Sequence, residues 1–186
     1  MQLTDVFADI LTSAPITKGR QSSHIQQWLG TTAVPQSLSI KIGTYLERLF
    51  NQLLGDYSIL NELPLVRQNH VIYYDDEEHQ VDILARIGDT IYHREMKANT
   101  DLDRGKKRDT LRREQAIVNA LKDRYPGTVI NSCVFCPFFT TSREVSGLGT
   151  VEGLTEFIYT FNLDITVQDF KDVGKSEQIH KLLLLK

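Results

Sequence analysis

Residues 81–97 read VDILARIGDTIYHREMK, and this stretch decides the fold because it has the pattern of two strands joined by a tight turn. Strand-forming, largely apolar segments stand on both sides of Gly88 and Asp89, a pair typical of a two-residue hairpin turn. Pairing outward from that turn brings Asp82 opposite Glu95. The register therefore predicts two facing carboxylates at the open end of a hairpin.

Two facing carboxylates need a positive charge between them, because cross-strand Cβ atoms lie only about 5 Å apart and like charges there are destabilising. A divalent cation such as Mg²⁺ meets that need, since it takes one or two carboxylates together with waters and phosphate oxygens. The period of two residues in a strand also puts Lys97 and His93 on the face of Glu95. A lysine at such a site orients or deprotonates the attacking water and stabilises the charge that builds on phosphorus. The pattern predicts phosphodiester hydrolysis, with Asp82 and Glu95 as metal ligands and Lys97 as a catalytic residue. It leaves open whether His93 contacts a phosphate or packs and hydrogen-bonds within the protein.

The chain on either side of the hairpin is typical of further helices and strands. Residues 40–55, IKIGTYLERLFNQLLG, carry a broad apolar stripe at helical spacing that ends at Gly55. The order of helix, strand meander, helix, strand and helix predicts an α/β or α+β layered domain. The other expected helices are 6–11, 24–29, 107–125 (stopped by Pro126 and Gly127), 150–161 and a C-terminal helix ending in the LLLL run; the expected strands are 66–74, 79–87, 90–97 and 128–135, with an acidic turn at 75–78.

Composition narrows the classes of protein. The 186 residues are 41% hydrophobic and 24% charged, which is typical of one globular domain spanning 1–186. No run approaches the roughly 18 apolar residues of a membrane span, and the N-terminus lacks a basic region followed by a long apolar run, so we expect a cytoplasmic protein without a membrane partner. The net charge of −3 excludes bulk electrostatic binding of nucleic acid by a polycation. Cys133 and Cys136 are predicted core cysteines, since residues three apart in a strand point to opposite faces and no second pair completes a zinc site.

The stretch 104–113, RGKKRDTLRR, carries six basic residues against Asp109. A cationic first turn opposes the helix dipole, which favours anions there, and contact with phosphates relieves the conflict. The pattern favours DNA-backbone binding by four of these side chains over an ordinary solvated helix start. These are Arg104, Lys106, Lys107 and Arg108.

At the hairpin residues 81–97 the chain resembles the PD-(D/E)XK nuclease superfamily. The motif is carried by Asp82, twelve intervening residues, and then Glu95, Met96 and Lys97, while Val81 stands where the motif name has proline. The order of elements extends the resemblance over about residues 38–140. The resemblance implies a restriction-endonuclease-like mixed sheet flanked by helices and Mg²⁺ as cofactor, with Mn²⁺ as a substitute.

Two helical positions extend the resemblance. Many members carry a glutamate on the core helix after a small residue one turn earlier, and Gly43 followed by Glu47 has that form. Glu47 is accordingly predicted as a third catalytic acid and metal ligand, against the alternative of a pair with a neighbour one turn away. Gln115 occupies the place where some members carry a glutamine on the helix after the E-x-K strand, and its participation stays open.

The expected partners are double-stranded DNA and a second subunit. Outside the core there remain about 35 N-terminal residues and a C-terminal helix, which is little for reading base edges. The chain is similar to the small subunit of heterodimeric Type IIS restriction endonucleases, whose large subunit recognises the site and nicks one strand. Two alternatives stay open: a homodimeric restriction or repair nuclease such as a junction resolvase, and a catalytically silent DNA-associated module.

Overall fold

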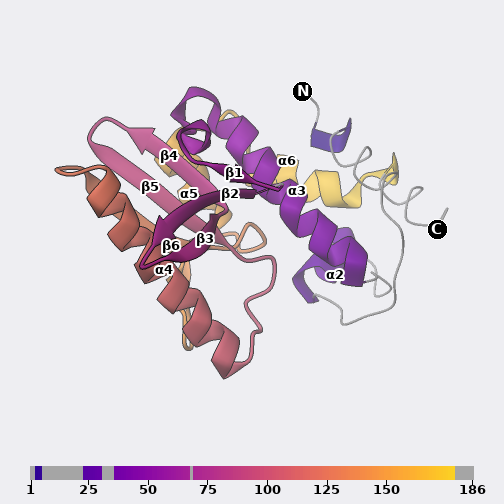
Figure 1. The fold of residues 1–186 in the computed structure, drawn as a ribbon. Helices are drawn as coiled ribbons and strands as arrows, with labels where there is room; N and C mark the ends of the chain where they lie inside the picture. The colour runs from indigo at the N-terminus through magenta and orange to yellow at the C-terminus, as the bar shows by residue number, and fades with distance from the viewer. Residues whose placement is uncertain (1–2, 6–22, 31–35, 68, 179–186) are drawn as a thin grey trace.

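Three small sheets with helices around them make up the computed structural model, which describes residues 3–5, 23–30, 36–67 and 69–178 (Figure 1). This is the α+β class that the sequence predicts. The helices are α2 (Ser23–Leu29), α3 (Gln36–Leu54), α4 (Arg104–Arg124), α5 (Leu154–Phe161) and α6 (Val167–Lys175), with short 3₁₀ turns at Gly55–Tyr57 and Leu60–Glu62. The strands are β1 (Leu65–Val66), β2 (Asn69–Tyr74), β3 (Glu77–Val81), β4 (Ile83–Ile87), β5 (Thr90–Met96), β6 (Val129–Phe135), β7 (Arg143–Val145) and β8 (Gly149–Val151).

The predicted hairpin is confirmed as β4 and β5. These strands are antiparallel, and Leu84 pairs with His93 as the two-residue turn requires. Gly88 has a φ of +56°, the left-handed conformation that favours glycine in such a turn. Helix α4 then returns the chain so that β6 lies parallel to β5. The central sheet is therefore mixed, in the order β4-β5-β6.

The predicted continuous strand 79–87 is wrong, because the chain bends at Asp82. Val81 pairs with His70 in the sheet β1-β2-β3, whereas Ile83 pairs with Arg94 in the central sheet. The residues before and after Asp82 pair with different strands, so the segment 79–87 is divided between β3 and β4. The bend leaves Asp82 between two sheets.

The two faces of the central sheet belong to two separate hydrophobic clusters. Ile83 and Ala85 pack with α3, whose buried stripe includes Leu46 and Phe50. That stripe ends as predicted, since Gly55 follows α3 with a φ of +53°. The opposite face carries Leu84 and Ile91, which pack against the α4 residues Ile117, Ala120 and Leu121. Figure 1 shows α4 and α3 on opposite sides of β4 and β5.

The C-terminal third contributes to the same core as α3. Phe157 of α5 stacks on Phe135 of β6, with ring centroids 4.3 Å apart. Trp28 of α2 donates its indole N–H to the Phe170 carbonyl of α6 over 2.9 Å and stacks on the Phe170 ring. The hairpin β7–β8 was not predicted, so the expected helix 150–161 begins only at Leu154. The expected helix 6–11 and the LLLL run lie outside the described residues.

Both cysteines are free thiols, and Cys136 is buried whereas Cys133 is half-buried. Burial raises the pKa of Cys133 to about 12 and that of Cys136 to about 11. A thiol with so high a pKa is a poor nucleophile and metal ligand. The prediction of core packing is confirmed for Cys136, which lies in a buried hydrophobic cluster, whereas Cys133 is only half-buried. Separately, the helices within the described ranges include none long and apolar enough to cross a membrane.

Candidate active site

Asp82 occupies the bend between β3 and β4 and reaches back to the hairpin. The strand ladder ends at the pair of Ile83 and Arg94, so Asp82 lies just beyond it rather than in a regular cross-strand pair with Glu95. Its Oδ2 accepts a hydrogen bond of 2.9 Å from the Met96 N–H, the residue next to Glu95. Burial raises the pKa of the Asp82 carboxyl, although Lys97, Arg113 and this N–H oppose the rise.

Glu95 is fully buried on the face of β5 that looks toward α4. Its Oε1 accepts from Lys97 Nζ over 2.5 Å, which confirms that Glu95 and Lys97 share a face. The same Oε1 also accepts a hydrogen bond from the guanidinium of Arg113 on α4, with which it forms an ion pair. The other carboxylate oxygen, Oε2, is buried and has no hydrogen-bond partner among the described residues. One oxygen of Glu95 is thus crowded by cations while the other is available for a ligand.

Glu47 reaches this cluster from helix α3. Its pKa is raised from 4.5 to about 8, first because the carboxyl group is buried and second because Asp82 carries a like charge beside it. Lys97 and Arg113 are close enough to oppose the rise. Glu47 therefore lies within electrostatic range of Asp82 and Lys97, and Lys97 in turn contacts Glu95.

Arg113 is the member of the cluster that the sequence did not single out. The sequence of residues 104–113 indicates only a basic segment, although Arg113 lies one helical turn after buried Thr110 and one turn before buried Ile117. That spacing puts it on the inner face of α4. Helical periodicity relative to these two residues is the signal that predicts its direction, toward β5.

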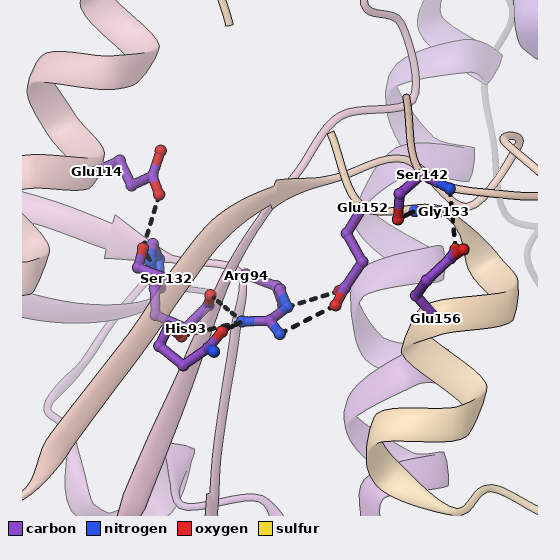
Figure 2. A network of polar contacts seen from close by, with 9 residues as sticks. His93, Arg94, Glu114, Ser132, Ser142, Glu152, Gly153 and Glu156 are labelled. Atoms are coloured by element: carbon purple, nitrogen blue, oxygen red, sulfur yellow. Dashed lines mark hydrogen bonds and ion pairs between the residues drawn. The ribbon is translucent and has the colours of Figure 1, made fainter. Parts of the chain in front are cut away.

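His93 belongs to a buried polar chain on the same face. Its Nδ1 lies 2.9 Å from the Ser132 hydroxyl, and Ser132 donates to Glu114 Oε1 over 2.8 Å (Figure 2). Burial first, and then the charges of Arg94 and Arg113, lower the pKa of His93 to about 3, so the imidazole is neutral. The hydrogen-bonding interpretation of His93 is favoured over contact with a phosphate.

The opposite face of β5 is fixed by Arg94. Its guanidinium forms a bidentate pair with Glu152, at 2.6 and 3.0 Å, and also donates to the carbonyl and side chain of Asn131 (Figure 2). Arg94 is only 2% exposed, and it connects β5 to the segment between β8 and α5. The side chains of two adjacent residues of β5 thus differ in their contacts: Arg94 binds Glu152 on one face of the sheet, and Glu95 binds Lys97 and Arg113 on the other.

Gln115 forms a local contact. Its Nε2 donates to Asn119 Oδ1 over 3.0 Å, one turn further along α4, and both contact atoms lie in an exposed environment. This i, i+4 pair is an ordinary helix-surface interaction.

The predicted DNA-binding residues form the start of α4. The helix dipole is already complemented by Asp103, which caps the helix by accepting from the Lys106 N–H over 2.9 Å and lies 3.5 Å from Lys106 Nζ. Lys107 donates to the Ser146 carbonyl in the β7–β8 turn over 2.7 Å. An open groove of about 850 Å³ runs between these elements, lined by Leu102, Arg104, Gly105, Lys107, Arg108, Leu111, Ser146 and Gly147. Arg104 and Arg108 remain exposed beside it.

The carboxylate oxygens of this site are chemically suitable ligands for a hard cation. Carboxylate oxygens are the ligands that Mg²⁺ prefers, and it needs only one or two of them. The unpaired, buried Oε2 of Glu95 is such an oxygen. Within the described part of the chain, no three His, Cys, Asp or Glu side chains lie close enough together to form a metal cage by themselves. Any metal site here therefore depends on waters or substrate oxygens for part of its coordination.

No model of a known protein family matches the chain, and no curated protein matches it either.

Proposed function

We propose that this chain is a Mg²⁺-dependent DNA endonuclease of the PD-(D/E)XK type, a Type II site-specific deoxyribonuclease, and that it is the strand-cleaving subunit of a heterodimeric Type IIS restriction enzyme. The observation that carries the proposal is the contact of Lys97 with Glu95 beside Asp82 and Glu47. An ammonium among three carboxyl groups, one of them with an unpaired buried oxygen, suits phosphodiester hydrolysis better than a purely structural ion pair.

Asp82 and Glu95 are the proposed metal ligands, with Glu47 as the third acid. The cation, when bound, supplies a Lewis acid that polarises a phosphoryl oxygen and activates water. Glu47 has a raised pKa, so it binds a metal only after it loses its proton. Mn²⁺ is expected to replace Mg²⁺, because both accept oxygen ligands in octahedral geometry.

Lys97 is the proposed residue for orienting the attacking water. Its side chain is 20% exposed, whereas Glu95 is fully buried, so the ammonium lies between the carboxylate and solvent. From there it donates hydrogen bonds to a water or to a phosphate oxygen, and its positive charge stabilises the pentavalent transition state. Asp82 and Glu95 are both held at β5, because Asp82 Oδ2 accepts a hydrogen bond from the Met96 N–H and Glu95 is itself a residue of the strand.

The start of α4 is the proposed contact with the DNA backbone. Arg104, Lys106, Lys107 and Arg108 lie on the same helix as Arg113, so the helix leads from the groove toward the candidate site. Phosphate contacts of this kind give affinity and register but no sequence information. Recognition is therefore assigned to a larger, sequence-reading and nicking subunit. The cytoplasm is the proposed location.

A cleavage assay with and without the partner tests the proposal. The chain is purified from its native host together with the proteins that copurify, and separately on its own. In Mg²⁺, one strand of duplex DNA should be cut at a defined position only by the mixture. Efficient sequence-specific cutting of both strands by the chain alone would replace the proposal with a homodimeric nuclease. Absence of Mg²⁺-dependent cleavage in both preparations would favour a silent DNA-associated module.

A further inference from the structure

Arg113 uses less of its hydrogen-bonding capacity than Arg94, the arginine of β5. Arg94 donates hydrogen bonds from Nε and both terminal nitrogens, to Glu152, Asn131 and the His93 carbonyl. Arg113 makes one contact with Glu95 Oε1, and its Nε is buried without a partner among the described residues. Since an arginine fork has five donors, Arg113 retains capacity for a second acceptor group.

Exposure places Arg113 at the outer edge of the cluster. The side chain of Glu95 is 0% exposed, that of Lys97 20% and that of Arg113 38%. A phosphate that approaches from solvent therefore meets the guanidinium before it reaches the carboxylate. Guanidinium groups bind phosphates in a bidentate manner, which suits the unused donors.

Charge balance points in the same direction. A divalent cation bound to Asp82 and Glu95 matches the two negative charges of these carboxylates, so Glu95 no longer needs Arg113 as its counter-ion. The positive charge of Arg113 is then surplus in the cluster, whereas a DNA phosphate brings one negative charge to it.

We infer that Arg113 is a substrate-contacting residue of the candidate site, which acts as counter-ion to Glu95 in the metal-free protein and contacts the DNA phosphate once Glu95 binds a divalent cation. This inference rests on the proposed function. It assigns two positions to one side chain: on Glu95 Oε1 without metal, and on a phosphate oxygen with metal. Metal and DNA binding are accordingly coupled through Arg113.

The test compares three variants of the full chain. Arg113→Ala removes the guanidinium, Arg113→Lys keeps the charge without the fork, and Arg112→Ala is the matched control because Arg112 is an exposed neighbour of equal charge on α4. Mn²⁺ binding without DNA is measured by calorimetry. Binding of a short DNA duplex is measured by fluorescence anisotropy at low salt, in chelator and in Ca²⁺.

Arg113→Ala should bind Mn²⁺ several-fold more tightly than wild type, since a competing cation has left Glu95. In Ca²⁺ it should bind the duplex about tenfold more weakly than the Arg112→Ala control, because a charge-assisted contact is lost. In chelator the two variants should bind the duplex alike, and Arg113→Lys should recover part of the affinity in Ca²⁺.

Equal duplex affinity of Arg113→Ala and Arg112→Ala in Ca²⁺ would overturn the inference and leave Arg113 as a fixed counter-ion. So would an unchanged Mn²⁺ affinity in Arg113→Ala. Failure of the proposed function itself has a different signature: Mn²⁺ would bind wild type and Asp82→Ala equally, or bind neither. In that case the metal site and the inference both fail.

Discussion

Asn51 of α3 donates its side-chain amide to the main-chain carbonyl of Asp82 over 2.7 Å, and so connects the core helix to the bend between β3 and β4. The same amide also donates to the Glu47 carbonyl one turn earlier, over 2.8 Å. Asp82 leaves the regular strand ladder at this point, so its carbonyl has no strand partner there. Asn51 thereby fixes the position of Asp82 relative to Glu47.

Replacing Asn51 with Ala should therefore loosen the bend. We expect the free energy of unfolding to fall by about 1–3 kcal/mol, because the partly buried Asp82 carbonyl loses its donor. Metal affinity should fall as well, since Asp82 and Glu47 are no longer held at a fixed separation. Urea denaturation and Mn²⁺ calorimetry measure both effects, with Gln52→Ala, an exposed neighbour on α3, as the control. A variant as stable as the control would show that the bend does not need this bond.

Glu95→Ala and Asp82→Ala should differ in stability. Glu95 is fully buried against Lys97 and Arg113, so its removal leaves two cations without their partner, and we expect a loss of about 3 kcal/mol. Asp82 has a raised pKa, so its loss removes an unfavourable charge along with one hydrogen bond, and we expect a change within about 1 kcal/mol. Urea denaturation of both variants without metal makes the comparison; equal losses would mean that Lys97 and Arg113 do not stabilise Glu95.

The stability of the metal-free protein should depend on pH through Glu47. Its pKa is about 8 in the folded protein against 4.5 for the ordinary group, so the folded state binds this proton more tightly than the unfolded state. The contribution is fully present below pH 4.5 and is lost as pH rises to about 8. We expect a fall of at most about 5 kcal/mol over that window, which Glu47→Gln abolishes. A wild-type profile that coincides with that of Glu47→Gln would place Glu47 away from Asp82.

Cleavage should require Mg²⁺ or Mn²⁺. Ca²⁺ is expected to occupy the site with little turnover, because its looser coordination positions water poorly. The rate of strand cleavage by the complex with its partner is measured in each cation and in chelator, and Ca²⁺ should inhibit the Mg²⁺ reaction competitively. Undiminished cutting in chelator would exclude a metal-dependent mechanism.

The hairpin and its neighbours could be predicted because local chemistry dictates them. The two-residue turn at Gly88 fixes the register of β4 and β5, and the period of two puts Lys97 beside Glu95. The apolar stripe of α3 and the glycine that ends it are equally local signals.

The bend at Asp82 and the place of Arg113 could not be read in the same way. An apolar run such as 79–87 is compatible with one long strand, and only the competition between two sheets for its two halves breaks it. Arg113 lies in a basic segment of residues that are mostly exposed, and its contact with Glu95 depends on how α4 packs on β5. The bend and the choice of Glu95 as the partner of Arg113 arise from tertiary packing, which local patterns do not encode, whereas helical spacing from Thr110 and Ile117 gives only the face of α4 on which Arg113 lies.

The central claim is that the cluster of Asp82, Glu95 and Lys97 cuts DNA. The most direct test is to measure the rate at which one labelled DNA strand is cut. Complexes of the partner with wild-type chain, Lys97→Ala and Asp82→Asn are compared in saturating Mg²⁺ under single-turnover conditions. We predict that wild type cuts its strand and that each variant is slower by at least about a hundredfold, while the nick made by the partner in the other strand is unchanged. Cutting of the first strand at the wild-type rate by Lys97→Ala or Asp82→Asn would contradict the assignment of this site.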